Sequence, residues 1–342
     1  MVLNYHIDKS RCLLYYARFI VKFLYLGKNP YKMAAQTFFL ISGIALLCIG
    51  SSMLVEGAAS TAAMFAVRPV IVGLTIVSLA TSAPELLVSL VAAFKGSGSI
   101  SLGNIIGSNI INIALVLGIS SVIRPVKIKK QVIWIEIPYM IFVSVVFWVL
   151  CMDLRIGRAD GIILLSLLAV FLIYGIKTAR DTDGSDSAIS RTGNSFFKNL
   201  FFIIAGIIML SYGANFVVRE AIDIANRIGL SQTFIGISVV ALGTSLPELA
   251  TSAMAAAKNE SDISVGNVVG SNLFNICLVM GTVGVFNPMD VNRQLHFFQF
   301  PAMIVISLIL AACAGLNKKI GKKAGGFFII FFVSYILISY LK

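Results

Sequence analysis

The sequence has few charged residues and few histidines. Only 12% of its 342 residues are charged, against roughly 25% in soluble domains, and the mean hydropathy is +0.94. This composition excludes a soluble domain and predicts an integral membrane protein. The two histidines, His6 and His296, lie outside the motifs described below. Their position disfavours a Ser/His hydrolase, and we expect a protein that is not an enzyme.

Cysteine is also scarce. The five cysteines are an odd number and mostly lie within apolar segments, which disfavours both a disulfide framework and a thiolate metal cluster. Basic residues outnumber acidic ones by 27 to 15. In a chain this apolar, we expect them to orient the protein in the lipid bilayer and not to bind nucleic acid. No cofactor is predicted.

Apolar segments of membrane-spanning length, about 20 residues each, fill most of the chain. We expect ten spans, five in each half, near residues 34–55, 69–94, 101–123, 132–151, 160–176, 199–218, 231–257, 264–286, 297–314 and 325–341. They divide the chain into a first repeat at 33–176, a polar linker at 177–198 and a second repeat at 199–342. The basic residues 1–32 predict an amphipathic interfacial segment, with Met33 as an alternative start.

An odd number of spans in each half makes the second repeat enter the bilayer from the opposite side, so the repeats are inverted. Loop charges support this arrangement, because the basic loop follows the third span in the first half and the fourth span in the second half. The positive-inside rule then predicts a cytoplasmic linker and external termini, although the basic residues of 1–32 argue against that orientation. The basic residues of the two loops are Arg124, Lys127, Lys129, Lys130, Lys318, Lys319, Lys322 and Lys323.

Two polar motifs recur inside apolar spans. Residues 73–94 read GLTIVSLATSAPELLVSLVAAF and residues 236–257 read GISVVALGTSLPELATSAMAAA, which places Glu85 and Glu248 163 residues apart. The same offset pairs GNIIGSNIIN at 103–112 with GNVVGSNLFN at 266–275. A carboxylate near the bilayer centre costs at least a few kcal/mol, so an acid there predicts a functional site. Two acids at corresponding positions predict one shared site.

The residues around these acids offer oxygen ligands. Pro84 and Pro247 should unwind the helices and free carbonyls near Ser78 and Ala241. Hard cations such as Ca²⁺ and Na⁺ bind oxygen, whereas zinc and copper favour the His and Cys that both motifs lack. The predicted side-chain ligands are Glu85, Glu248, Thr81, Ser82, Thr244, Ser245, Asn112 and Asn275, with Ser108 and Ser271 as further candidates.

Other polar and small residues receive supporting roles. Asn104, Asn109, Asn267 and Asn272 cap helix breaks or cross-link helices, and Glu56 and Glu136 are interpreted as solvated helix ends. The repeated glycines of the second motif allow close helix approach. They are Gly103, Gly107, Gly266 and Gly270.

With its paired LATSAPELLVSL and LGTSLPELATSA motifs, the chain resembles the calcium/cation antiporter superfamily, particularly its Na⁺/Ca²⁺ exchanger branch and related bacterial inner-membrane exchangers. The resemblance implies an all-α fold of ten helices in two inverted repeats, with alternating access by movement of the first and sixth spans. It also implies that Glu85 and Glu248 serve both ions, that the carbonyls of Ser78 and Ala241 bind Na⁺, and that Ser108 and Ser271 flank the outer sodium positions. Asn112 and Asn275 complete the centre.

The leading hypothesis is a monomeric secondary antiporter that exchanges Ca²⁺ for Na⁺. H⁺ or K⁺ is the alternative counter-ion, although the chain lacks the acidic motif of the proton-coupled branch. A cation channel could use paired acids as a selectivity ring. A channel usually multiplies such rings by oligomerisation, whereas this chain supplies two different halves itself.

Overall fold

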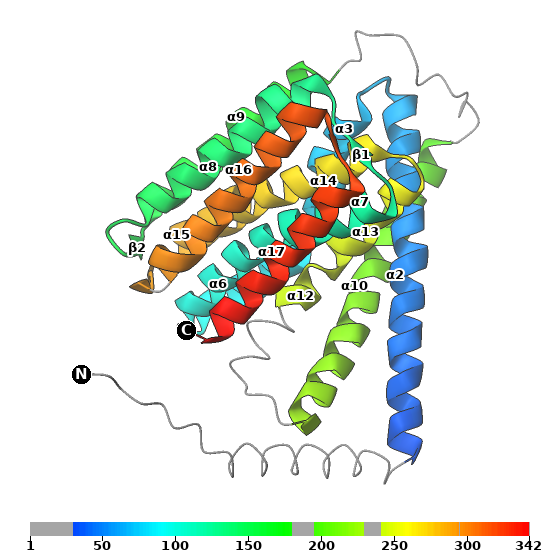
Figure 1. Ribbon diagram of the computed structural model, residues 1–342, viewed down its shortest axis with the longest axis horizontal. Coiled ribbons are helices and arrows are strands. Elements are labelled where there is room, and N and C mark those ends of the chain that lie inside the picture. Colours follow the sequence, from blue (N-terminus) through cyan, green and yellow to red (C-terminus); the bar gives the residue numbers. More distant parts are fainter. Residues whose placement is uncertain (1–29, 180–194, 229–240, 294, 342) are drawn as a thin grey trace.

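The computed structural model describes residues 30–179, 195–228, 241–293 and 295–341. The predicted amphipathic segment and most of the linker lie outside these ranges. Within these ranges the regular structure is helical apart from four two-residue strands (Figure 1). In the described residues, five π-helical stretches interrupt the helices, at η2 (Gly73–Val77), η3 (Asn112–Leu117), η4 (Val132–Glu136), η6 (Phe274–Met280) and η7 (Leu295–Gln299).

The helices of the first half occupy the predicted spans. They are α2 (Pro30–Met64), α3 (Pro69–Val72) with α4 (Ser78–Thr81), α5 (Ala83–Phe94), α6 (Gly98–Ile111), α7 (Gly118–Ile123), α8 (Ile137–Leu150) and α9 (Arg158–Lys177). The second half contains α10 (Phe196–Ile228), α12 (Ala241–Thr244), α13 (Leu246–Ala257), α14 (Ser261–Leu273), α15 (Gly281–Phe286), α16 (Phe300–Asn317) and α17 (Lys322–Leu341).

Eight helices in the described residues are long and apolar enough to cross a membrane, and the bent pair Pro69–Thr81 and Ala83–Phe94 makes nine. The remaining predicted span, 231–257, is described only from residue 241. The first and sixth spans are longer than predicted, because α2 continues through Glu56 and α10 continues through Arg219. The polar residues that ended these spans in the sequence analysis therefore lie inside helices.

The third and eighth spans form the centre of the bundle. The most apolar windows of Gly98–Ile123 and Ser261–Phe286 are 78% and 83% buried, whereas the same measure is 44% or less for the other unbroken spans. Their neighbours expose many large apolar side chains, as lipid-facing helices do. The central pair carries the repeated motifs GNIIGSNIIN and GNVVGSNLFN, which are therefore shielded from the bilayer.

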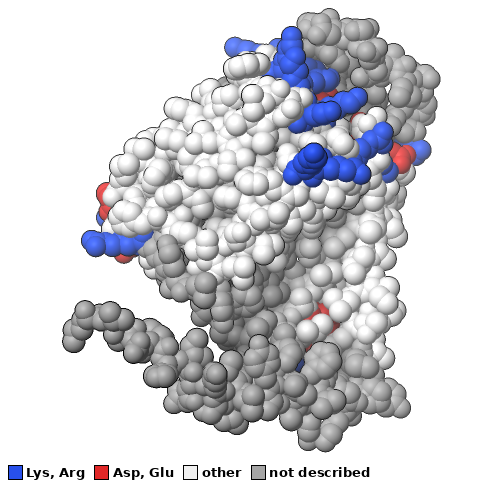
Figure 2. Space-filling view, in the orientation of Figure 1, with Lys and Arg blue, Asp and Glu red and all other residues white. Residues whose placement is uncertain are grey.

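Short strands tie the two halves together at both ends of the bundle. β1 (Val126–Lys127) pairs antiparallel with β4 (Lys319–Ile320), and β2 (Arg155–Ile156) pairs with β3 (Met289–Asp290). The two basic loops of the sequence analysis are thus joined to each other. Lys and Arg gather at the end of the molecule where β1 lies (Figure 2).

The helices α2 and α10 pack side by side in opposite directions (Figure 1). Glycines allow this contact: a Cβ built on Gly43 would lie 2.9 Å from the carbonyl oxygen of Gly213, and one on Gly206 would lie 2.8 Å from that of Gly50. Real Cβ atoms do not approach so closely, so the spacing between the two helices requires glycine.

Candidate cation site

The two glutamates lie at the start of new helices. Pro84 and Pro247 occupy the first turn of α5 and α13, where a backbone N–H has no partner within the helix and proline is tolerated. The chain bends by 44° between α4 and α5. Glu85 and Glu248 follow in the same first turns, where the helix dipole favours a carboxylate.

The helix break is narrower than predicted. Ser82 is the single residue between α4 and α5, and its N–H donates to the carbonyl of Ser78 at 2.9 Å. The Thr81 hydroxyl oxygen lies 3.3 Å from the same carbonyl. The expectation that this carbonyl is freed is therefore wrong, because the donor that Pro84 lacks would reach the carbonyl of Ala80 instead. Ala241 is the first residue of α12.

The serine three residues before each glutamate bonds the glutamate of the other half. Ser82 Oγ donates to Glu248 Oε1 at 3.2 Å, and Ser245 Oγ donates to Glu85 Oε1 at 3.3 Å. The S-x-P-E sequence has the spacing of a helix capping box, yet neither serine caps its own helix. Each serine instead donates to the carboxylate at the helix break of the other half. These two bonds hold the carboxylates of both halves in one site.

The neighbouring threonines bond across the halves in the same manner. Thr81 Oγ1 donates to Asn267 Oδ1 at 3.1 Å, and Thr244 Oγ1 donates to Asn104 Oδ1 at 3.4 Å. The two asparagines in turn donate to serines of their own half, Asn104 to Ser89 at 3.1 Å and Asn267 to Ser252 at 2.9 Å. The two serines were missed in the sequence analysis, although their shared 163-residue offset was available as a signal.

Ser108 and Ser271 differ from each other. Ser108 Oγ donates to Glu85 Oε1 at 3.4 Å, whereas Ser271 Oγ lies 3.4 Å from Thr81 Oγ1. Both side chains are fully buried. The structure thus places Ser108 against a carboxylate and Ser271 against a hydroxyl.

Four buried oxygen atoms at this site have no hydrogen-bond partner among the described residues. They are Glu85 Oε2, Glu248 Oε2, Asn112 Oδ1 and Asn275 Oδ1, and all four side chains are 0% exposed. A buried acceptor without a donor costs about 1–3 kcal/mol, and more when it is charged. Four such oxygens, two on each half, are what a bound hard cation would satisfy.

The donor set contains no soft ligand. The described residues contain no group of three or more His, Cys, Asp or Glu side chains placed so that they could hold a metal ion. The four described cysteines are free. Two carboxylates surrounded by amides and hydroxyls suit Ca²⁺ or Na⁺ and not a thiolate- or imidazole-bound metal.

Glu136 corrects another expectation. It was interpreted as a solvated helix end, but its side chain is 1% exposed and neither carboxylate oxygen has a partner among the described residues. It lies in η4, outside the repeated motifs. Its side chain is buried because the segment before α8 packs into the bundle. Glu56 is partly exposed, and its carboxylate lies 3.9 Å from Lys258 Nζ.

Comparison with known proteins identifies the family. The profile described as "Sodium/calcium exchanger protein" matches residues 35–177 and 198–341, which is most of both halves. The chain belongs to the sodium/calcium exchanger family. It is therefore a multi-pass membrane antiporter of the cation and Ca²⁺ exchange type, and this family is one of transporters and not of enzymes.

Individual relatives agree with this assignment. The chain is 35% identical to the inner membrane protein YrbG of Escherichia coli over 86% of this chain and 93% of that protein. It is 30% identical to the sodium/calcium exchanger MaX1 of Methanosarcina acetivorans over 88% and 97% of the two chains. A structure of the sodium-calcium exchanger NCX_Mj matches 90% of this chain and 99% of that one, with a TM-score of 0.78 and 30% identity.

Proposed function

We propose that this exchanger moves Ca²⁺ in one direction and Na⁺ in the other, and that Glu85 and Glu248 hold both ions in turn. The observation that carries the proposal is the set of four unpartnered buried oxygens, two from each half. Two carboxylates carry a charge of −2, which one Ca²⁺ neutralises. Na⁺ ions compete for the same oxygens, so the two substrates exclude each other.

Mutual exclusion explains why such a site exchanges ions. An empty pair of buried carboxylates is too costly to carry through a closed intermediate, because ionised groups away from water lose their solvation. The site therefore crosses between the two sides only when a cation neutralises it. The residues proposed to line it are Glu85, Glu248, Asn112, Asn275, Thr81, Ser82, Thr244, Ser245, Ser108 and Ser271, with the carbonyl of Ala241 as a Na⁺ ligand.

The proposed architecture is ten spans in two inverted repeats, 33–176 and 199–342. The strand pairs support it, because each joins the loop after a third span to the loop after a fourth span of the other half. Such pairing is expected when the two halves run in opposite directions. With the basic β1–β4 end facing the cytoplasm, the linker is cytoplasmic and the termini are external. We place the protein in a bacterial inner membrane as a functional monomer.

Ion flux into vesicles tests the function. Purified protein in proteoliposomes loaded with Na⁺ should take up ⁴⁵Ca²⁺ from a Na⁺-free medium, and uptake should stop when an ionophore dissipates the Na⁺ gradient. Separate K⁺ and pH gradients, imposed without Na⁺, assign the counter-ion. Uptake driven by either of these gradients and not by Na⁺ would refute the choice of Na⁺, and Ca²⁺ flux without any counter-ion would indicate a channel.

A further inference from the structure

Asn109 of α6 and Asn272 of α14 form a reciprocal pair between the halves. Asn109 Nδ2 donates to the backbone carbonyl of Asn272 at 3.4 Å, and Asn272 Nδ2 donates to the backbone carbonyl of Asn109 at 3.3 Å. A backbone carbonyl only accepts hydrogen bonds, so the side-chain atom that faces it must be the NH₂ group. The other neighbours of these nitrogens are the thioethers of Met303 and Met140, at 3.7 and 3.6 Å, which also only accept.

This orientation fixes the next pair of amides. With their nitrogens committed, Asn109 and Asn272 turn their Oδ1 atoms toward Asn275 and Asn112, which donate to them through Nδ2 at 3.1 Å each. An amide oxygen cannot donate, so Asn275 and Asn112 must present their NH₂ groups there. Their own Oδ1 atoms are left on the opposite edge of each amide, buried and unpartnered.

The orientation of Asn112 and Asn275 decides whether the site offers oxygen or N–H to a cation. The two ends of an amide have nearly the same shape, so packing alone does not select between them. Rotating the Asn275 amide by half a turn would bring its oxygen against Asn109 Oδ1 and would point two N–H groups at the cation. The backbone carbonyls of Asn109 and Asn272 fix the amides of this pair, and the pair in turn accepts hydrogen bonds from Asn112 and Asn275. These bonds prevent the rotation.

We infer that Asn109 and Asn272 are positioning residues of the cation site, which orient the Asn275 and Asn112 amides so that their oxygens face the ion. They touch no ion themselves. The inference rests on the proposed function, because it assigns a role toward the ion that the function requires.

A double-mutant cycle tests the inference in the full-length protein in detergent. The measurement is the Ca²⁺ concentration that raises Tm by a fixed amount above its value in cation-free buffer, with Na⁺ as the second cation. Asn275→Ala removes the proposed ligand. Asn109→Ala keeps the Asn275 amide but removes the hydrogen bond that orients it. We expect each change to raise this concentration by about tenfold, which corresponds to one hydrogen bond. The double variant should bind no more weakly than Asn275→Ala alone.

The mirror cycle uses Asn272→Ala and Asn112→Ala and should behave in the same way. Asn109→Leu keeps the side-chain volume and replaces Asn109→Ala if the latter does not fold. Asn287→Ala is the matched control, because Asn287 also donates its amide to a backbone carbonyl of the other half, that of Ala93, but bonds no ion-facing residue. It should lower Tm in cation-free buffer without changing the Ca²⁺ concentration that raises Tm by the fixed amount.

Three outcomes overturn the inference. Losses that add in the double variant, or an unchanged Ca²⁺ dependence in both Asn109→Ala and Asn109→Leu, would contradict it and leave the proposed function intact if the wild type still exchanges ions. A wild type whose Tm responds to neither Ca²⁺ nor Na⁺ and that shows no flux would overturn the function and the inference together.

Discussion

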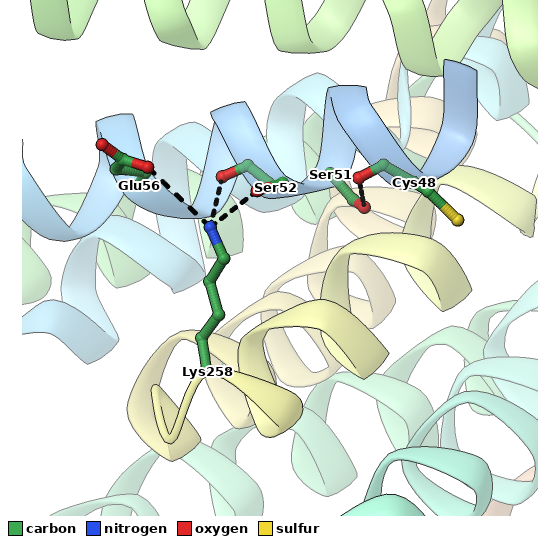
Figure 3. A network of polar contacts seen from close by, with 5 residues as sticks. All are labelled: Cys48, Ser51, Ser52, Glu56 and Lys258. Carbon is green, nitrogen blue, oxygen red and sulfur yellow. Dashed lines mark hydrogen bonds and ion pairs between the residues drawn. The ribbon is translucent and has the colours of Figure 1, made fainter. Parts of the chain in front are cut away.

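The two halves of the molecule agree closely at the cation site and diverge at its periphery. Within the site, the bond from Ser82 to Glu248 has its counterpart in the bond from Ser245 to Glu85, at nearly equal length. The Asn109–Asn272 pair is likewise reciprocal. At the periphery, Lys258 at the end of α13 bonds Ser52 and lies near Glu56 of α2 (Figure 3), whereas the residues at the matching positions are Lys95, Asn215 and Arg219.

This difference indicates which parts of the molecule must be duplicated. In the proposed site, a cation held between the halves would take a carboxylate and an amide oxygen from each, so a change in one half alone would unbalance the site. The peripheral contacts touch no ion and can differ without that cost. Variants made in pairs, one in each half, therefore separate residues of the site from residues that only hold the bundle together.

The largest expected effect is from the carboxylates. Glu85→Gln and Glu248→Gln each leave the buried pair with a charge of −1, which one Ca²⁺ no longer matches, so Na⁺-driven ⁴⁵Ca²⁺ uptake should fall to background in both. Because each change also removes a buried charge without a full set of partners, the Tm in cation-free buffer should stay equal or rise. Retained uptake in either variant would refute the proposed site and would show that the two halves do not contribute equally.

Removing the serines should weaken exchange less. Ser82→Ala and Ser245→Ala each delete a hydrogen bond to a carboxylate, worth about 1.5–3 kcal/mol, so both should raise the Ca²⁺ concentration for half-maximal uptake by about ten- to a hundredfold. Equal losses in the two variants would support the reciprocal arrangement in which each serine bonds the glutamate of the other half. Ser108→Ala should weaken Ca²⁺ uptake more than Ser271→Ala, because only Ser108 bonds a carboxylate directly; the reverse order would contradict this asymmetry.

The glycines of α2 and α10 test the equivalence of the halves through stability. Gly43→Ala and Gly206→Ala occupy matching positions, and each places a Cβ within 3 Å of a carbonyl of the facing helix. Such overpacking costs about 1–3 kcal/mol, so both should lower Tm by a similar amount. Gly326→Ala in α17 is the control, since a Cβ there meets no described atom within 4 Å. A Tm loss in only one of the pair would show that the contact is not symmetric.

The repeated motifs led to the candidate site from sequence, because a carboxylate inside an apolar span is costly and its repetition at a fixed offset points to one site. The bonds between the two motifs support this prediction. Composition and the length of apolar runs similarly predicted nearly every span. The sequence could not show that Ser82 bonds the opposite Glu248 and not its own helix, since the capping pattern is local and the bond crosses between halves. Nor could it show that Glu136 is buried, because a span end in sequence carries no information on which loops pack over it.

The smallest expected effect concerns the contact that only one half makes. Lys258 Nζ donates to the Ser52 hydroxyl at 2.7 Å and to its carbonyl at 3.1 Å, and lies 3.9 Å from Glu56 Oε2. The ammonium and the carboxylate are both partly exposed, so solvent screening limits the ion pair to at most about 1 kcal/mol. Lys258→Met should therefore lower Tm by a few degrees at most, and by less at high salt. The matching Lys95→Met should leave Tm unchanged, because the counterpart of Glu56 is the cationic Arg219; an equal loss in both would show that the periphery shares the symmetry of the site.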